Sequence, residues 1–369
     1  MKNNLSRIDV WSYLEEYKKL RSKILKSVDK VFKSGQLILG NEVFNLEKKF
    51  SQYTSNQYGV GVNSGTDALQ IILMALDIQK DDEIITTSNT AVPTVSAIVS
   101  SGAKPVFVDI NECDYLINCE KVEKKINKKT KAIIAVNLYG QCADYKSLIK
   151  ISKKYNIMII EDCAQSTGAL YMGKPSGSFG AMSAFSFYPT KNLGAYGDGG
   201  MIVTNKKKYY EKCKKIRKYG MSKLYYSDMH GINSRLDEVQ AAIINLKISY
   251  LDEAIKKRRK IALRYNNEIK NIDLILPKEN KDCYHSFYVY VVRHKKRDSI
   301  MQYLKKNGVF SNISYPFPIH LMKGYKYLGY KKNDLPITES ISKQIFSLPM
   351  YPQLTMCQVD KVIKLINNY

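Results

Sequence analysis

The chain has 369 residues, of which 44% are hydrophobic and 25% charged. This composition is typical of a globular protein with two or three domains, and the absence of any run of about eighteen apolar residues excludes a transmembrane helix. The net charge of +24 would suit nucleic acid or anionic lipid, but the lysines are spread along the chain without a nucleic-acid-binding motif, so we expect a solvated basic surface and neither partner.

Targeting and metal-binding patterns are also missing. The stretch from Met1 to Arg7 lacks the apolar core of a signal peptide, so we expect a cytoplasmic protein. The seven cysteines form no CxxC pair, and none of the four histidines stands at metal-ligand spacing from a cysteine. We therefore expect reduced thiols and no metal site.

Hydrophobic periodicity predicts an alternation of helices and strands along most of the chain. Helices are predicted at 8–33, 40–50, 68–76, 144–155, 236–269, 297–307 and 357–368, and strands at 58–62, 83–87, 104–109, 132–140, 157–162, 201–205 and 284–292. This order favours an α/β fold with a mostly parallel sheet covered on both faces. From about residue 285 the pattern changes to α+β. We therefore expect a large domain over 1–245 and a smaller C-terminal domain over 246–369.

The turn after the first predicted strand, at residues 63–67, contains Gly65 and leads directly into a helix. Free N–H groups and the positive helix end at such a turn can bind an anion. A helix cap made by Thr66 or Asp67 explains the same residues. Both interpretations stay open on the sequence alone.

Other polar residues also fall where predicted strands end, and the carboxyl ends of parallel strands are where chemistry collects in such sheets. The set is Gly65, Asn89, Asp109, Tyr139, Asp162 and Lys191. Asp162 follows a strongly apolar strand, so it is either a helix cap or a buried carboxylate that holds a cation. Lys191 stands between an aromatic run and four glycines, so it is either an ordinary exposed turn residue or an activated amine.

Four motifs in this order make the chain resemble the DegT/DnrJ/EryC1/StrS sugar aminotransferases. They are Asn63-Ser64-Gly65-Thr66-Asp67-Ala68-Leu69, Glu161-Asp162-Cys163-Ala164-Gln165-Ser166, Phe185 to Gly200, and Asn233-Ser234-Arg235-Leu236-Asp237. The resemblance implies the aspartate aminotransferase fold, which has a mostly parallel seven-stranded sheet in its large domain. It also implies the cofactor pyridoxal 5'-phosphate (PLP) and a homodimer with shared active sites.

The resemblance assigns a role to each motif residue. Lys191 would form the covalent link to PLP and act as the catalytic acid and base, Asp162 would hold the proton on the ring nitrogen, and Gln165 would contact the ring hydroxyl. The phosphate would be bound by Gly65, Thr66, Ser186 and, from the neighbouring subunit, Asn233. Members that act as dehydratases replace the lysine with histidine, so Lys191 favours transamination.

The residues around Lys191 resemble the branch that aminates C-3 of dTDP-3-keto-6-deoxyhexoses with L-glutamate. Members acting at C-4 usually carry His-Pro-x-Lys and Gly-Glu-Gly-Gly, whereas this chain has Tyr188-Pro189-Thr190-Lys191 and Gly197-Asp198-Gly199-Gly200. The implied product is a dTDP-3-amino-3,6-dideoxyhexose, galacto or gluco, for surface glycans. A C-4 aminotransferase of the same fold is the alternative, and a basic nucleic-acid-binding or regulatory protein is a more distant one.

Substrate contacts are expected from aromatic and basic side chains. Tyr188 and Tyr315 would line the sugar site, with His320 shortly after the second tyrosine. The candidates for holding the diphosphate are Arg217, Lys218 and Arg259. Many members stack an aromatic residue on the PLP ring, and the corresponding position here is Ala91.

Overall fold

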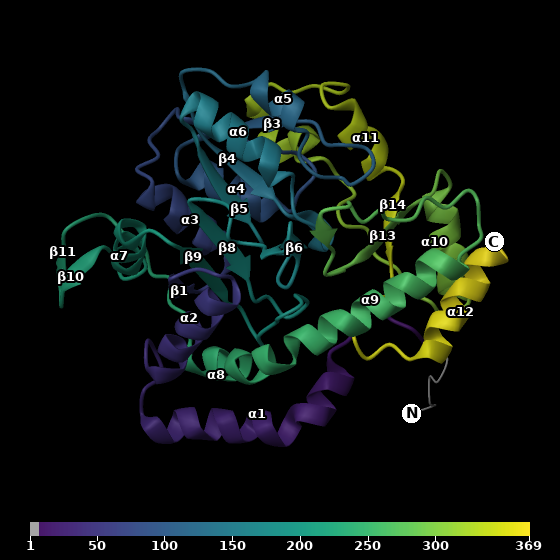
Figure 1. Cartoon of the computed structure of the whole chain (residues 1–369), viewed down its shortest axis with the longest axis horizontal. Helices are drawn as coiled ribbons and strands as arrows, with labels where there is room; N and C mark the ends of the chain where they lie inside the picture. Colours follow the sequence, from purple (N-terminus) through teal and green to yellow (C-terminus); the bar gives the residue numbers. More distant parts are fainter. Residues whose placement is uncertain (1–6) are drawn as a thin grey trace.

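The computed structural model describes residues 7–369, so most of the N-terminal stretch behind the localisation expectation lies outside it. Its centre is a seven-stranded sheet (Figure 1). Across the sheet the strands are β1 (Tyr58–Val62), β9 (Gly200–Thr204), β8 (Met182–Ser186), β5 (Met158–Asp162), β4 (Thr130–Val136), β2 (Glu83–Thr87) and β3 (Lys104–Val108). Only β9 runs antiparallel to its neighbours in this sheet. The expected mostly parallel α/β architecture is confirmed.

Helices cover both faces of the sheet. Between residues 41 and 247 the helices are α2 (Asn41–Tyr53), α3 (Gly65–Ala75), α4 (Val92–Ser100), α5 (Cys119–Glu123), α6 (Tyr145–Tyr155), α7 (Lys207–Ile216) and α8 (Glu238–Lys247). Successive side chains of a strand point to opposite faces. In β8, Met182 and Ala184 therefore join the core beneath α3, whereas Phe185 packs edge-on against Phe50 of α2 with ring centroids 4.9 Å apart.

A second core lies in the C-terminal part of the chain, around Tyr265, Tyr290 and Phe346. The core is built from α9 (Leu251–Glu268), β13 (Tyr290–Arg293), α10 (Arg297–Lys306), β14 (Ile345–Leu348) and α12 (Met356–Asn367). The same part of the chain also forms β12 (Cys283–Tyr284) and α11 (Pro336–Ser342), which pack outside this core. Ile8 packs into this core, and its N–H donates to the carbonyl of Gly308 at 2.8 Å. The division of domains at residues 245 and 246 stays a prediction.

The N-terminal helix α1 (Leu14–Ser34) begins later than expected and lies along α8 (Figure 1). Its buried residues Leu20 and Ile24 meet Ile243 of α8. Within residues 7–369, no helix combines the length and apolar character needed to cross a membrane. All seven cysteines are free thiols.

The single strand predicted at 284–292 is wrong, because the chain forms two short strands, β12 and β13, separated by an irregular segment. Phe287 there has a φ of 44°, in the left-handed region. The backbone of the segment bonds elsewhere: the Ser286 N–H donates to the Gly140 carbonyl at 2.8 Å, and Arg258 donates to the carbonyls of Phe287 and Tyr288, each at 3.2 Å. These long-range partners replace a strand ladder.

Candidate active site

A cavity of about 290 Å³ opens where β5 and β8 end, and α3 and α4 begin beside it. Its wall contains Gly65 and Thr66 from the start of α3, Asp162 from the end of β5, and Lys191 from the loop after β8. The C-terminal part of the chain adds Tyr288 and Tyr315. The cavity thus lies where the chemistry of parallel sheets is expected.

Asp162 is the last residue of β5 and is only 5% exposed. Its carboxylate accepts hydrogen bonds from the Thr94 hydroxyl at 2.7 Å and from the Ala164 N–H at 3.1 Å. Burial raises the pKa of the Asp162 carboxyl, and the hydrogen bonds and the charge of Lys191 offset that effect only in part. No helix begins after Asp162, so the helix-cap interpretation is wrong.

Lys191 is half-buried in a loop with defined backbone hydrogen bonds. Its N–H donates to the Tyr188 carbonyl at 2.8 Å. Its ammonium group lies 4.6 Å from the centre of the Tyr288 ring, and the Tyr288 hydroxyl bonds to the Thr190 hydroxyl at 3.0 Å. The lysine is therefore oriented by contacts from another part of the chain.

The Gly65 turn is both capped and open to an anion. Ser64 caps α3, because its hydroxyl accepts from the Asp67 N–H at 3.1 Å, so neither Thr66 nor Asp67 is the cap. A Cβ at position 65 would lie 2.8 Å from the Cβ of Ser186. The glycine therefore lets the N-terminus of α3 lie close to the Ser186 side chain, and both line the cavity, an arrangement that suits the binding of a phosphate group there.

Gln165 and Tyr315 form a fixed pair in the wall. The Gln165 side-chain oxygen accepts from the Tyr139 N–H at 2.8 Å, and its amide nitrogen donates to the Tyr315 hydroxyl at 2.8 Å. Burial raises the pKa of the Tyr315 hydroxyl, which therefore stays protonated at neutral pH. Tyr188 is 52% exposed and Ala91 lies in the wall, where an aromatic residue was expected from the resemblance.

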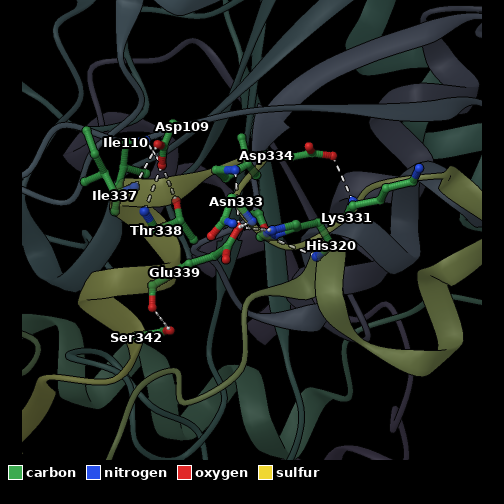
Figure 2. Close-up of polar contacts among 12 residues, drawn as sticks. Asp109, Ile110, His320, Lys331, Asn333, Asp334, Ile337, Thr338, Glu339 and Ser342 are labelled. Carbon is green, nitrogen blue, oxygen red and sulfur yellow. Dashed lines mark hydrogen bonds and ion pairs between the residues drawn. The ribbon is translucent and has the colours of Figure 1, made fainter.

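Two substrate assignments require correction because their side chains are buried and already paired. Arg217 is paired with Glu47 and donates to the Gly61 carbonyl at 2.7 Å. His320 is 1% exposed and bonds to Ser88 at 2.7 Å and to Glu339 at 3.2 Å (Figure 2). Buried charged and polar groups need such partners, so neither side chain is free to bind a ligand.

The other basic candidates also lie outside the cavity wall. Arg259 is paired with Glu279 at 2.6 Å and donates to the His285 carbonyl at 2.9 Å. Lys218 is exposed and pairs through its backbone with Asn233, which is exposed as well. Within the described part of the chain, Lys191 is the only lysine or arginine in the wall.

Two residues of the site, Thr94 and Tyr288, are not among those predicted from the sequence. Thr94 carries a recognisable signal, since it is a hydroxyl residue in the first turn of the helix that follows β2. Tyr288 gives no local signal, because its contact with Lys191 depends on the irregular segment between β12 and β13.

These residues fit PLP on three counts. The buried Asp162 carboxylate accepts its hydrogen bonds from neutral donors, so a protonated ring nitrogen would supply the charged donor that it lacks. The N-terminus of α3 lies beside Ser186 in the cavity wall, which suits the phosphate, and Lys191 supplies an amine in the same cavity.

Comparisons with known proteins agree with this geometry. The model of the DegT/DnrJ/EryC1/StrS aminotransferase family matches residues 18–367. The chain is 46% identical to the dTDP-3-amino-3,4,6-trideoxy-alpha-D-glucose transaminase of Micromonospora megalomicea subsp. nigra, over 97% of each chain. It is 43% identical to the dTDP-3-amino-3,6-dideoxy-alpha-D-galactopyranose transaminase of Aneurinibacillus thermoaerophilus, over 95% of this chain and 96% of that one.

A solved structure is similar throughout. The S. venezuelae protein DesV, in complex with a ketimine intermediate, superposes with a TM-score of 0.96 at 35% identity, covering 98% of each chain. The family, fold and cofactor expected from the four motifs are confirmed. The chain belongs to the DegT/DnrJ/EryC1/StrS aminotransferase family and is a PLP-dependent sugar aminotransferase.

Proposed function

We propose that the protein transfers the amino group of L-glutamate to C-3 of a dTDP-linked 3-keto-6-deoxyhexose. The observation that carries this choice is that Tyr188 and Asp198, which distinguish the chain from the C-4 pattern, both line the cavity that contains Lys191. Two relatives at 46% and 43% identity are named as transaminases of dTDP-3-amino sugars. The product would be a dTDP-3-amino-3,6-dideoxyhexose, which would then serve surface glycan synthesis.

In this proposal, Lys191 moves the protons. When bound, PLP supplies an electron sink for the carbon next to the substrate nitrogen. The Lys191 amine would remove the proton from Cα of glutamate, whose carbon takes up oxygen from water and leaves as 2-oxoglutarate once the cofactor has taken over the amino nitrogen. In the second half of the cycle Lys191 would deliver a proton to C-3 of the sugar, which receives that nitrogen and loses its keto oxygen as water. The Tyr288 ring holds the lysine over the cavity, 4.6 Å from its ammonium group.

The remaining cofactor contacts keep the reacting atoms in place. Asp162 keeps a proton on the ring nitrogen, and Thr94 orients that carboxylate through the 2.7 Å hydrogen bond. The N-terminus of α3, with Gly65 and Thr66, binds the phosphate together with Ser186. Gln165 contacts the ring hydroxyl and positions Tyr315 toward the sugar.

We further propose a homodimer in which each subunit completes the other's site. The phosphate, the diphosphate and the donor carboxylates are all anionic, yet the described cavity wall holds the single cation Lys191. Asn233 and Lys218 are exposed on adjoining backbone and would serve the partner's cofactor phosphate and sugar diphosphate.

Exposed apolar residues support an interface of this kind. Phe32 and Phe44, at the start of the chain, are 61% and 63% exposed. The hairpin of β10 (Met221–Lys223) and β11 (Tyr226–Ser227) stands away from the body (Figure 1), and Tyr225 at its tip is 88% exposed. Large apolar side chains in such numbers favour burial against another protein surface. The free thiols favour the reducing cytoplasm as its location.

The regiochemistry can be tested directly. The enzyme is incubated with L-glutamate and, separately, the dTDP-3-keto and dTDP-4-keto forms of a 6-deoxyhexose, and the new C–N bond is located by NMR. We expect turnover of the 3-keto sugar and an amine at C-3. Preferential amination at C-4 would contradict the proposal and favour the alternative aminotransferase.

A further inference from the structure

His320 belongs to a buried polar junction (Figure 2), where it joins Glu339 of α11 to Ser88, the residue that follows β2. Burial acts to raise the pKa of the Glu339 carboxyl, but hydrogen bonds from the Asn333 N–H and from His320 outweigh it, and the pKa is lowered. Glu339 is therefore ionised at neutral pH and accepts the proton of His320 Nε2 at 3.2 Å. In the tautomer that carries its proton on Nε2, His320 Nδ1 accepts from the Ser88 hydroxyl at 2.7 Å.

Ser88 is bound to the His320 segment at three points. Besides the Nδ1 contact, its hydroxyl oxygen accepts from the His320 N–H at 3.0 Å, and its carbonyl accepts from the Ile319 N–H at 3.2 Å. Ser88 is also the first residue after β2, at the start of the loop that leads into α4. The C-terminal part of the chain thus fixes the start of this loop.

The first turn of α4, which follows this loop directly, reaches Asp162 through Thr94. The Thr94 hydroxyl has one proton, which it donates to the Asp162 carboxylate at 2.7 Å, so the Thr90 hydroxyl is the donor in its 2.9 Å contact with Thr94. Thr90 and Thr94 are both buried. Ala91 and Thr94 also line the cavity. A displacement of the loop would therefore move the group that orients Asp162.

We propose that His320 is a positioning residue for the cofactor: by fixing Ser88, it holds the loop before α4 and the first turn of α4, so that Thr94 aligns Asp162 with the cofactor ring nitrogen. The inference rests on the role proposed above for Asp162. It gives His320 an indirect function in place of the substrate contact that the sequence suggested.

The same junction offers a matched control in Asp109. Its carboxylate accepts from the Ile337 N–H at 3.0 Å, and from the N–H and hydroxyl of Thr338 at 2.8 and 2.7 Å (Figure 2). Asp109 therefore fastens α11 to the end of β3, whereas His320 fastens its segment to the cofactor loop. An effect caused by general loosening of the junction would follow from a change at either residue.

Two substitutions at His320 separate its two contacts. In His320→Asn the side-chain oxygen can replace Nδ1 as the acceptor for Ser88, whereas in His320→Gln the longer amide can replace Nε2 as the donor to Glu339. The readouts are amide hydrogen exchange of residues 88–94 in the protein without cofactor, the Kd for PLP, and the pH dependence of the bound-cofactor absorbance. Ser88→Ala tests the same contact from the other side if a His320 variant fails to fold.

We expect His320→Gln and Ser88→Ala to speed exchange in the loop, to weaken PLP binding by about 3- to 10-fold, as the loss of a hydrogen bond would, and to shift the pH midpoint of the absorbance. We expect His320→Asn to stay near the wild type, and Asp109→Asn to leave the loop and the midpoint unchanged. Equal effects of His320→Asn and His320→Gln, or of His320→Gln and Asp109→Asn, would overturn the proposal. None of these readouts depends on which sugar carbon is aminated. A failure of the proposal for His320 can therefore be distinguished from a failure of the proposed reaction.

Discussion

Tyr288 is the residue through which the C-terminal part of the chain touches Lys191. A cation over an aromatic face contributes about 0.5–2 kcal/mol, so we expect Tyr288→Ala to lower kcat by about 2- to 30-fold. Tyr288→Phe keeps the ring and loses only the bond to Thr190, so it should retain most of the activity. Steady-state kinetics at saturating glutamate check this, and an alanine variant as active as the phenylalanine variant would contradict it.

Asp162 makes the stability of the cofactor-free protein depend on pH. Its pKa is raised by burial, so the folded state binds the Asp162 proton more tightly than the unfolded state does. Ionised Asp162 therefore lowers the free energy of unfolding at neutral pH. This destabilisation disappears as the pH falls through the folded-state pKa toward the pKa of the unfolded state.

It follows that Asp162→Asn should raise the Tm of the cofactor-free protein at neutral pH. The difference should shrink at acidic pH, while the loaded enzyme loses activity. Thermal denaturation of both proteins over a pH series measures the effect. A stabilisation that grows as the pH falls would show that the pKa of Asp162 is not raised in the folded protein.

At the scale of elements, the start of α3 depends on a glycine. A Cβ at Gly65 would lie 2.8 Å from the Cβ of Ser186, and overpacking of this kind costs about 1–3 kcal/mol. We expect Gly65→Ala to push α3 from β8 and to weaken PLP binding about tenfold or more. Gly324→Ala is the control, because nothing lies within 4 Å of a Cβ there. Equal PLP affinity in the two variants would exclude the proposed cradle.

Site residues that depend on local sequence patterns could be predicted from the sequence, whereas contacts between distant segments could not. Gly65, Asp162 and Lys191 could be placed together because the carboxyl ends of the strands carry them to one edge of the sheet, and each strand has a local signal. The contact of Tyr288 depends on a segment whose backbone bonds to Arg258 and Gly140, far away in the chain. No local pattern encodes it.

Arg217 and His320 were predicted to contact the substrate, but the fold places both elsewhere. Residue type favoured ligand contacts for both, but type does not reveal burial. Glu47, which pairs with Arg217, and Ser88, which pairs with His320, are 170 and 232 positions away in the sequence. Partners at such separations become visible only when the fold is known.

At the scale of the whole molecule, a dimer with shared sites predicts complementation between inactive subunits. Lys191→Ala removes the catalytic amine, and Asn233→Ala removes the proposed contact with the partner's phosphate. In a mixed dimer, one site would combine an intact Lys191 with an intact Asn233. Mixing the two variants under conditions of subunit exchange should therefore restore activity, measured by 2-oxoglutarate release. Activity that stays at the sum of the separate variants would place Asn233 in its own subunit's site.

The central claim, that Lys191 carries an amino transfer in this cavity, is tested most directly by following the nitrogen itself. Wild-type enzyme and Lys191→Ala are each supplied with PLP, a dTDP-3-keto-6-deoxyhexose and ¹⁵N-labelled L-glutamate, and the sugar product is analysed by NMR. We predict label on C-3 with the wild type, and a rate lower by at least about 10²- to 10⁴-fold with the variant, the range typical of a lost acid–base group. Label transfer at the wild-type rate by Lys191→Ala would contradict the account.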